Sequence, residues 1–122
     1  MYIEKELIDF QSDVIEASKT TPVLVDFWAE WCGPCVQLSP TLEKLAEEAG
    51  DSWTLLKVNT ESQPELAAEY GIRSIPNVKL FVNGEISGEF VGALPEEEIK
   101  RWLESNIPDK SGIEKVEETS SA

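Results

Sequence analysis

The chain has 122 residues, with 24 acidic side chains against 10 basic ones and a formal net charge of −14. This length suits one domain with its own hydrophobic core, and a hydrophobic content of 41% argues against disorder over most of the chain. The charge excludes nucleic acid and anionic membrane surfaces as expected partners, because phosphate binding requires clustered Lys and Arg.

The N-terminal residues and the hydropathy pattern predict a cytoplasmic protein. Residues 1–6, MYIEKE, lack the basic start, the apolar stretch and the small-residue cleavage site of a signal peptide. No segment approaches the roughly 20 apolar residues of a membrane span. In a reducing compartment, two closely spaced cysteines are more often catalytic or metal-binding than a structural bridge.

The first half of the chain alternates predicted strands and helices. In chain order these are an edge strand over residues 3–8, a helix over 10–18, a strand over 23–28, a helix over 36–49 and a strand over 53–58. The central strand is apolar except for Asp26, which is typical of a strand covered on both faces. Pro40 lies inside the second helix, where we expect a kink and not an end, because the apolar periodicity continues past it.

The second half predicts a helix, a hairpin and a last helix. A capping box at residues 62–65 predicts a short helix that runs to about Tyr70. Strands over 78–82 and 85–91 flank Asn83-Gly84, which is a strong signal for a two-residue hairpin. Pro95 opens the last helix. The element order predicts an α/β sheet that combines parallel crossovers with one antiparallel hairpin and carries helices on both faces.

The composition changes after Pro108. Residues 109–122 consist mainly of Ser, Glu, Lys and Thr. We therefore expect a domain over residues 1–108 and a polar, flexible tail over 109–122, which is either a natural tail or the start of a linker to another domain.

The two cysteines of the chain, Cys32 and Cys35, lie between a predicted strand and a predicted helix. The helix dipole and free N–H groups at a helix start favour a thiolate over a thiol, so this spacing indicates a dithiol redox site. Cys32 is then the exposed nucleophile, with a lowered pKa, and Cys35 is the shielded cysteine that resolves the mixed disulfide. A structural zinc site is disfavoured, because the chain has no His and no further Cys. A structural disulfide over so short a loop would constrain little of the unfolded chain.

Residues 25–35, VDFWAEWCGPC, resemble the active-site signature of the thioredoxin family. Further matches are Lys57, residues 70–76 and residues 91–94, and the resemblance covers about residues 2–107. It implies a thioredoxin fold with a central mixed five-stranded sheet flanked by four helices, and a cis peptide bond before Pro76 that faces the cysteines. It also implies a monomeric protein-disulfide reductase with no bound cofactor, which receives electrons from NADPH through a flavin-dependent thioredoxin reductase.

Asp26 interrupts an apolar strand, and a buried charged carboxylate is costly. If this side chain is buried, its pKa should rise and make it a proton acceptor near neutral pH. If the strand is bulged, Asp26 would point into solvent instead. The resemblance implies that Asp26 is the base that activates the buried cysteine through water, and that Lys57 on the adjacent strand is its charge partner.

A substrate surface is expected around the cysteines. Pro34 stiffens the loop and Gly33 lets a partner chain approach closely. Pro76 is either an ordinary proline at a strand start or a cis residue that leaves the backbone of Ile75 available to pair with an extended substrate. The family resemblance implies a docking surface composed of Trp31, Gly33, Pro34, Ile75, Pro76, Gly92 and Ala93.

Two positions depart from common family residues. Val36 stands where many members carry Lys, which is expected to raise the pKa of Cys32 slightly or to change partner choice. Asn77 stands where Thr is common. The function predicted is reduction of protein disulfides. The alternative is a thioredoxin-like client-binding or chaperone module cut from a longer protein, and the polar tail keeps that alternative open.

Overall fold

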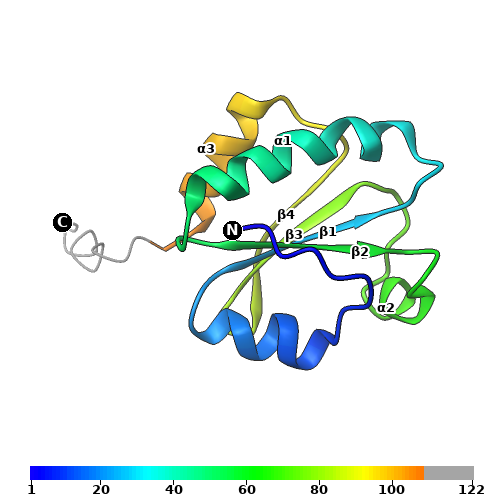
Figure 1. Ribbon diagram of the computed structural model, residues 1–122, viewed down its shortest axis with the longest axis horizontal. Coiled ribbons are helices and arrows are strands. Elements are labelled where there is room, and N and C mark those ends of the chain that lie inside the picture. Colours follow the sequence, from blue (N-terminus) through cyan, green and yellow to red (C-terminus); the bar gives the residue numbers. More distant parts are fainter. Residues whose placement is uncertain (109–122) are drawn as a thin grey trace.

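The computed structural model describes residues 1–108, so the predicted tail over 109–122 lies outside the described residues. Its strands form one mixed sheet in the order β2-β1-β3-β4 (Figure 1). The strands are β1 (Val23–Trp28), β2 (Thr54–Asn59), β3 (Asn77–Val82) and β4 (Glu85–Val91). β1 pairs in parallel with β2 and antiparallel with β3, so the apolar strand occupies the interior of the sheet.

Helical segments cover both faces of this sheet. They are η1 (Gln11–Glu16), η2 (Ala17–Lys19), α1 (Gly33–Ala49), α2 (Pro64–Glu69) and α3 (Glu96–Asn106). α1 and α3 lie on one face, and η1 and α2 lie on the other (Figure 1). This arrangement confirms the predicted α/β architecture. Within residues 1–108, no helix combines the length and the apolar character needed to cross a membrane.

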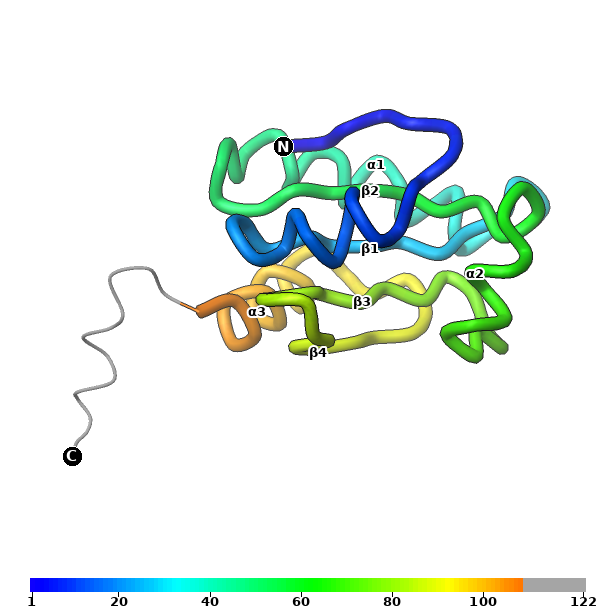
Figure 2. Tube along the Cα trace, turned by 90° about the horizontal axis from the view of Figure 1, so that it is seen from below, coloured from blue at the N-terminus to red at the C-terminus, as the bar shows by residue number. Residues whose placement is uncertain are grey.

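The predicted edge strand over residues 3–8 is wrong, and the described sheet has four strands in place of the expected five. The N-terminal segment runs beside β2 (Figure 2) but forms only an isolated parallel bridge between Tyr2 and Leu55. Two backbone hydrogen bonds hold it there, from the N–H of Ile3 to the carbonyl oxygen of Leu55 and from the N–H of Leu55 to the carbonyl oxygen of Met1. Residues 4–6 are charged and exposed, so burial does not extend this pairing.

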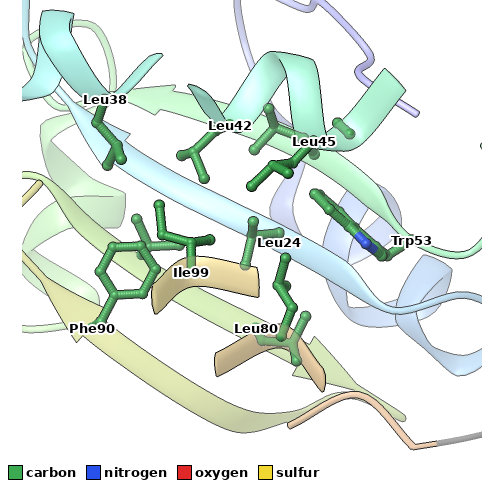
Figure 3. Close-up of a cluster of buried hydrophobic side chains, with 12 residues drawn as sticks. Leu24, Leu38, Leu42, Leu45, Trp53, Leu80, Phe90 and Ile99 are labelled. Atoms are coloured by element: carbon green, nitrogen blue, oxygen red, sulfur yellow. The ribbon is translucent and has the colours of Figure 1, made fainter. Parts of the chain in front are cut away.

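The buried core has one part on each face of the sheet. Figure 3 shows Leu38, Leu42 and Leu45 of α1 pointing toward Leu24 of β1 and Ile99 of α3. The opposite face buries a second cluster beneath η1 and α2, composed of Ile8, Phe10, Val14, Val23, Val25, Phe27, Leu56, Val58 and Phe81. Burial of each large apolar side chain contributes about 1.5–3 kcal/mol, so α1 is held firmly on the sheet.

Two local details differ from the predictions. The helix expected over residues 10–18 is present, but as a π-helical turn followed by a 3₁₀ turn. The predicted capping box at residues 62–65 is wrong, because the N-cap residue is Gln63 and its side chain makes no capping bond. The Gln63 amide instead donates to the carbonyl oxygen of Ile8 and accepts from the Ile8 N–H, both at 2.9 Å, and so ties α2 to the N-terminal segment.

Two predictions from turn and helix chemistry are confirmed. Asn83 and Gly84 both adopt positive φ, 58° and 83°, as the tight turn between β3 and β4 requires. α1 continues through Pro40 and ends before Gly50, whose φ is 60°. It begins at Gly33, three residues before the predicted start, since Pro34 fits a first-turn position where no N–H partner is needed.

Candidate active site at the start of helix α1

The two cysteines form a disulfide at the N-terminus of α1, with their Cα atoms 5.2 Å apart. Cys32 is the N-cap residue, and its Sγ accepts a hydrogen bond from the backbone N–H of Cys35 at 3.2 Å. The first turn of a helix presents unpaired N–H groups and a partial positive charge. The geometry therefore places the sulfur of Cys32 where negative charge on a thiolate is stabilised.

The prediction of an exposed Cys32 is wrong for this disulfide-bonded form. Cys32 is 5% exposed and Cys35 is 1% exposed. Both cysteines belong to a small buried cluster with Ala29, against which Trp28 and Ile75 pack. The order of exposure still agrees with the expected roles, because Cys32 is the more accessible of the two.

The residues expected to form the docking surface surround this disulfide. The peptide bond between Ile75 and Pro76 is cis, as the resemblance implies, and the carbonyl oxygen of Ile75 lies 3.7 Å from Sγ of Cys32. The N–H of Gly92 donates to the carbonyl oxygen of Pro76 at 2.9 Å, which holds these two loops together. Pro76 itself is buried, so within this pair Ile75 is the residue that a partner can touch.

The rim of the site is apolar and exposed. Trp31 is 70% exposed, and its indole N–H donates to a carboxylate oxygen of Glu61 at 2.9 Å. Gly33, Pro34 and Ala93 are exposed, and Gly92 is partly exposed. Two apolar side chains absent from the predicted surface are also exposed at adjacent chain positions, Val36 on α1 and Val91 at the end of β4. Their position beside Cys35 and Gly92 in the sequence was the signal that could have identified them.

Asp26 is fully buried in β1, which overturns the alternative of a bulged strand with this side chain in solvent. It lies on the same face as Leu24, beneath α1, whose inner face also carries Cys35. Neither carboxyl oxygen has a hydrogen-bond partner within the described part of the chain. Burial raises the pKa of Asp26 to about 7, the positive charge of Lys57 lowers this pKa, and the negative charge of Glu43 raises it. The predicted rise in pKa is therefore confirmed.

Lys57 stands directly across from Asp26 in the register of β1 and β2. Its ammonium group, however, donates to Oγ of Ser39 and forms an ion pair with Glu43 at 2.8 Å. Lys57 therefore makes no direct ion pair with Asp26, and it acts as the predicted charge partner through space, where its positive charge lowers the pKa of Asp26. Glu43 is 39% exposed, so an ion pair there costs less desolvation than a pair with a buried carboxylate.

The assembled site combines a helix-capped cysteine pair with a buried acid of near-neutral pKa. The family model of thioredoxin matches residues 2–105. The chain belongs to the thioredoxin family. Its thioredoxin fold is thus confirmed, with four strands in the described sheet, and so is its class as a thiol-disulfide oxidoreductase that reduces protein disulfides. The redox group of such an enzyme is the cysteine pair itself.

Thioredoxins of several organisms resemble the chain over most of its length. The thioredoxin of Rhodospirillum rubrum is 42% identical over 80% of this chain and 92% of that protein. The thioredoxin of Porphyra purpurea is 45% identical over 80% of this chain and 90% of its own length. The thioredoxin of Chlorobaculum thiosulfatiphilum is 39% identical, and the match covers 87% of this chain and 96% of that protein.

Proposed function

We propose that this thioredoxin-family chain reduces protein disulfides in the cytoplasm, with Cys32 as the nucleophile and Cys35 as the resolving cysteine. The observation that carries this proposal is the hydrogen bond from the N–H of Cys35 to Sγ of Cys32 at the start of α1. A thiolate on Cys32 would accept the same bond and feel the same helix dipole. Cys35 is one turn into the helix and almost fully buried, which suits a thiol that reacts only with its neighbour.

The reaction consists of two thiol-disulfide exchanges. The Cys32 thiolate attacks one sulfur of a client disulfide, the client S–S bond breaks, and a mixed disulfide forms while the other client sulfur leaves as a thiolate. The Cys35 thiolate then attacks Sγ of Cys32, which releases the second client sulfur. The client gains two electrons and two protons, and the enzyme is left with the Cys32–Cys35 disulfide that the structure contains.

Asp26 is the proposed base of the second exchange. It accepts the proton of the Cys35 thiol, directly or through water, and its pKa of about 7 suits a group that must take up and release a proton near neutral pH. The positive charge of Lys57 lowers the pKa of Asp26, and in this proposal that is the role of Lys57 in the site. Asp26 is the only carboxyl group among the buried residues of the described chain, which supports this choice.

Clients are proposed to dock on the rim of the site. An apolar, extended segment would contact the exposed indole of Trp31 and the side chain of Ile75, and Gly33 would let its backbone approach, since nothing lies within 4 Å of a Cβ placed there. The proposed docking surface comprises Trp31, Gly33, Pro34, Ile75, Gly92 and Ala93, and the buried Pro76 lies behind it next to Ile75.

Recycling is proposed to follow the route of the family. A thioredoxin reductase would return two electrons from NADPH to the disulfide, so that the protein serves as an electron carrier, and it would act as a monomer built from a single domain over residues 1–108. Its negative charge suits partners whose contact surfaces carry basic residues.

The test is reduction of insulin in the presence of NADPH and a thioredoxin reductase. The wild-type chain should consume NADPH in proportion to the insulin disulfides reduced, and a Cys32→Ser variant should consume none above background. If the folded, reduced wild-type protein fails in this assay with reductases from several sources, the client-binding module becomes the better description.

A further inference from the structure

Lys57 is bonded to a small polar network on α1. The ammonium group of Lys57 contacts Ser39 and Glu43, which are one turn apart on the helix, and Ser39 also donates to the Glu43 carboxylate at 3.1 Å. The Lys57 side chain is only 13% exposed, so this is not an ordinary surface ion pair. The aromatic rings of Tyr2 and Trp28 flank the ammonium group, with centroids 5.6 and 5.3 Å away.

The same network leaves Asp26 without a bonded partner. In the strand register Asp26 and Lys57 are direct neighbours, and a lysine with no other acceptor in reach would be expected to turn toward that carboxylate. Both oxygens of Asp26 nevertheless lack a hydrogen-bond partner within residues 1–108. The ammonium group of Lys57 is thus bonded to acceptors on α1 and not to its register neighbour Asp26.

We propose that Glu43, assisted by Ser39, is a positioning residue that holds the Lys57 ammonium group on α1 and away from Asp26, so that the Asp26 carboxyl group stays available to take the proton of Cys35. The inference rests on the proposed role of Asp26 as the base. The side-chain hydrogen-bond partners of Glu43 are Ser39 and Lys57, so its positioning effect on Asp26 is exerted through Lys57 and adds to the direct effect of its own charge.

The physical reason is the effect of a nearby cation on a buried acid. A direct ion pair with Lys57 would stabilise the carboxylate and lower the pKa of Asp26 by about 1–3 units, which would weaken it as a base. Glu43 prevents this by supplying a competing carboxylate closer to solvent, and its own charge opposes ionisation of Asp26. Among the described residues, the phenol of Tyr2 in the N-terminal segment also interacts with the charge of Asp26, and Cys35 on α1 is held in the disulfide in the oxidised protein. β3 places the apolar Val78 opposite Asp26.

The experiment is an NMR titration of the Asp26 carboxyl carbon in the oxidised protein. Four proteins are compared: wild type, Glu43→Gln, Lys57→Met and the double variant. We expect Glu43→Gln to lower the titration midpoint of Asp26 by about 1 pH unit when Lys57 is present, because the lysine is then released toward Asp26. In the Lys57→Met background the same substitution should lower the midpoint by less than half as much.

Two further variants make the test specific. Ser39→Ala should lower the midpoint in the same direction by a smaller amount, since it removes one acceptor of Lys57 and keeps the ion pair. Glu48→Gln removes one negative charge from an exposed position on the same helix and should leave the midpoint unchanged.

Equal shifts with and without Lys57 would mean that Glu43 acts only through its own charge, and the positioning role would be wrong. If Glu43→Gln leaves the titration midpoint of Asp26 unchanged both with and without Lys57, the positioning role of Glu43 would also be wrong. The pH profile of the resolving step, measured on the same variants, should move with the NMR midpoint. If the NMR midpoint of Asp26 moves as expected while Asp26→Asn reduces clients at the wild-type rate, the positioning role survives and the proposed role of Asp26 as base fails.

Discussion

Asp26 and Lys57 are register partners in adjacent parallel strands, yet the ammonium group of Lys57 is bonded to α1 and the carboxyl group of Asp26 has no bonded partner in the described chain. Burial raises the pKa of Asp26 to about 7, and the separation leaves Lys57 to lower this pKa only through space. The raised pKa makes Asp26 both a candidate base and a pH-dependent cost to stability, and these two consequences can be tested separately.

Replacement of Asp26 by Asn should slow the resolving step. Asn keeps the size of the side chain but cannot accept the proton of Cys35, so the rate of client release near pH 7 should fall by about tenfold or more. Stopped-flow measurement of mixed-disulfide resolution between pH 6 and 9 checks this. The wild-type rate should rise with pH around 7, and the variant should lose that step. An unchanged rate and profile would exclude Asp26 as the base.

The same variant should change how stability depends on pH. Asp26 keeps its proton in the folded oxidised protein up to about pH 7, whereas the unfolded chain loses it near 3.8. Between these values the folded state binds more protons, so its stability falls as pH rises. This group should cost the wild type about 4 kcal/mol between pH 4 and pH 8 relative to Asp26→Asn.

Urea unfolding of the oxidised proteins at a series of pH values measures this difference. The gap between the variant and the wild type should widen with pH and level off above pH 8. A gap that stays constant with pH would show that the folded-state pKa of Asp26 is near its ordinary value.

Replacement of Trp31 by Ala should weaken client docking without weakening the fold. Trp31 is largely exposed, so the free energy of unfolding should change by less than about 0.5 kcal/mol. The KM for a protein client should rise several-fold, because exposed aromatic side chains at interfaces often dominate binding. Trp53→Ala is the matched control, since Trp53 is a core residue and its loss should cost about 3–5 kcal/mol of stability. An unchanged KM in Trp31→Ala would remove Trp31 from the docking surface.

The sequence predicted those features that depend on strong local patterns. The apolar run of β1, the Cys32–Cys35 spacing and the Asn83-Gly84 turn each restrict the backbone or the chemistry to few options. The burial of Asp26 could be reasoned only as one of two alternatives, because the strand pattern does not distinguish a bulge from a buried acid.

The missed features depend on contacts between distant segments. The choice of Lys57 between Asp26 and Glu43 is decided by how α1 lies on the sheet, and no spacing in the sequence reports that. The use of Gln63 to bind the backbone of Ile8, in place of a helix cap, is likewise a tertiary contact. The buried Cys32 reflects the packing of Trp28 and Ile75 against the disulfide, and Ile75 is distant from the cysteines in the sequence.

Trapping of mixed disulfides tests most directly which of the two cysteines is the nucleophile. Reduced Cys35→Ser, mixed with a disulfide-containing client, should accumulate a stable mixed disulfide on Cys32 that is visible on a non-reducing gel. Reduced Cys32→Ser should accumulate almost none, because Cys35 is buried and lies one turn into α1. Equal trapping by the two variants, or trapping by Cys32→Ser alone, would contradict the assignment of Cys32 as the nucleophile and Cys35 as the resolving cysteine.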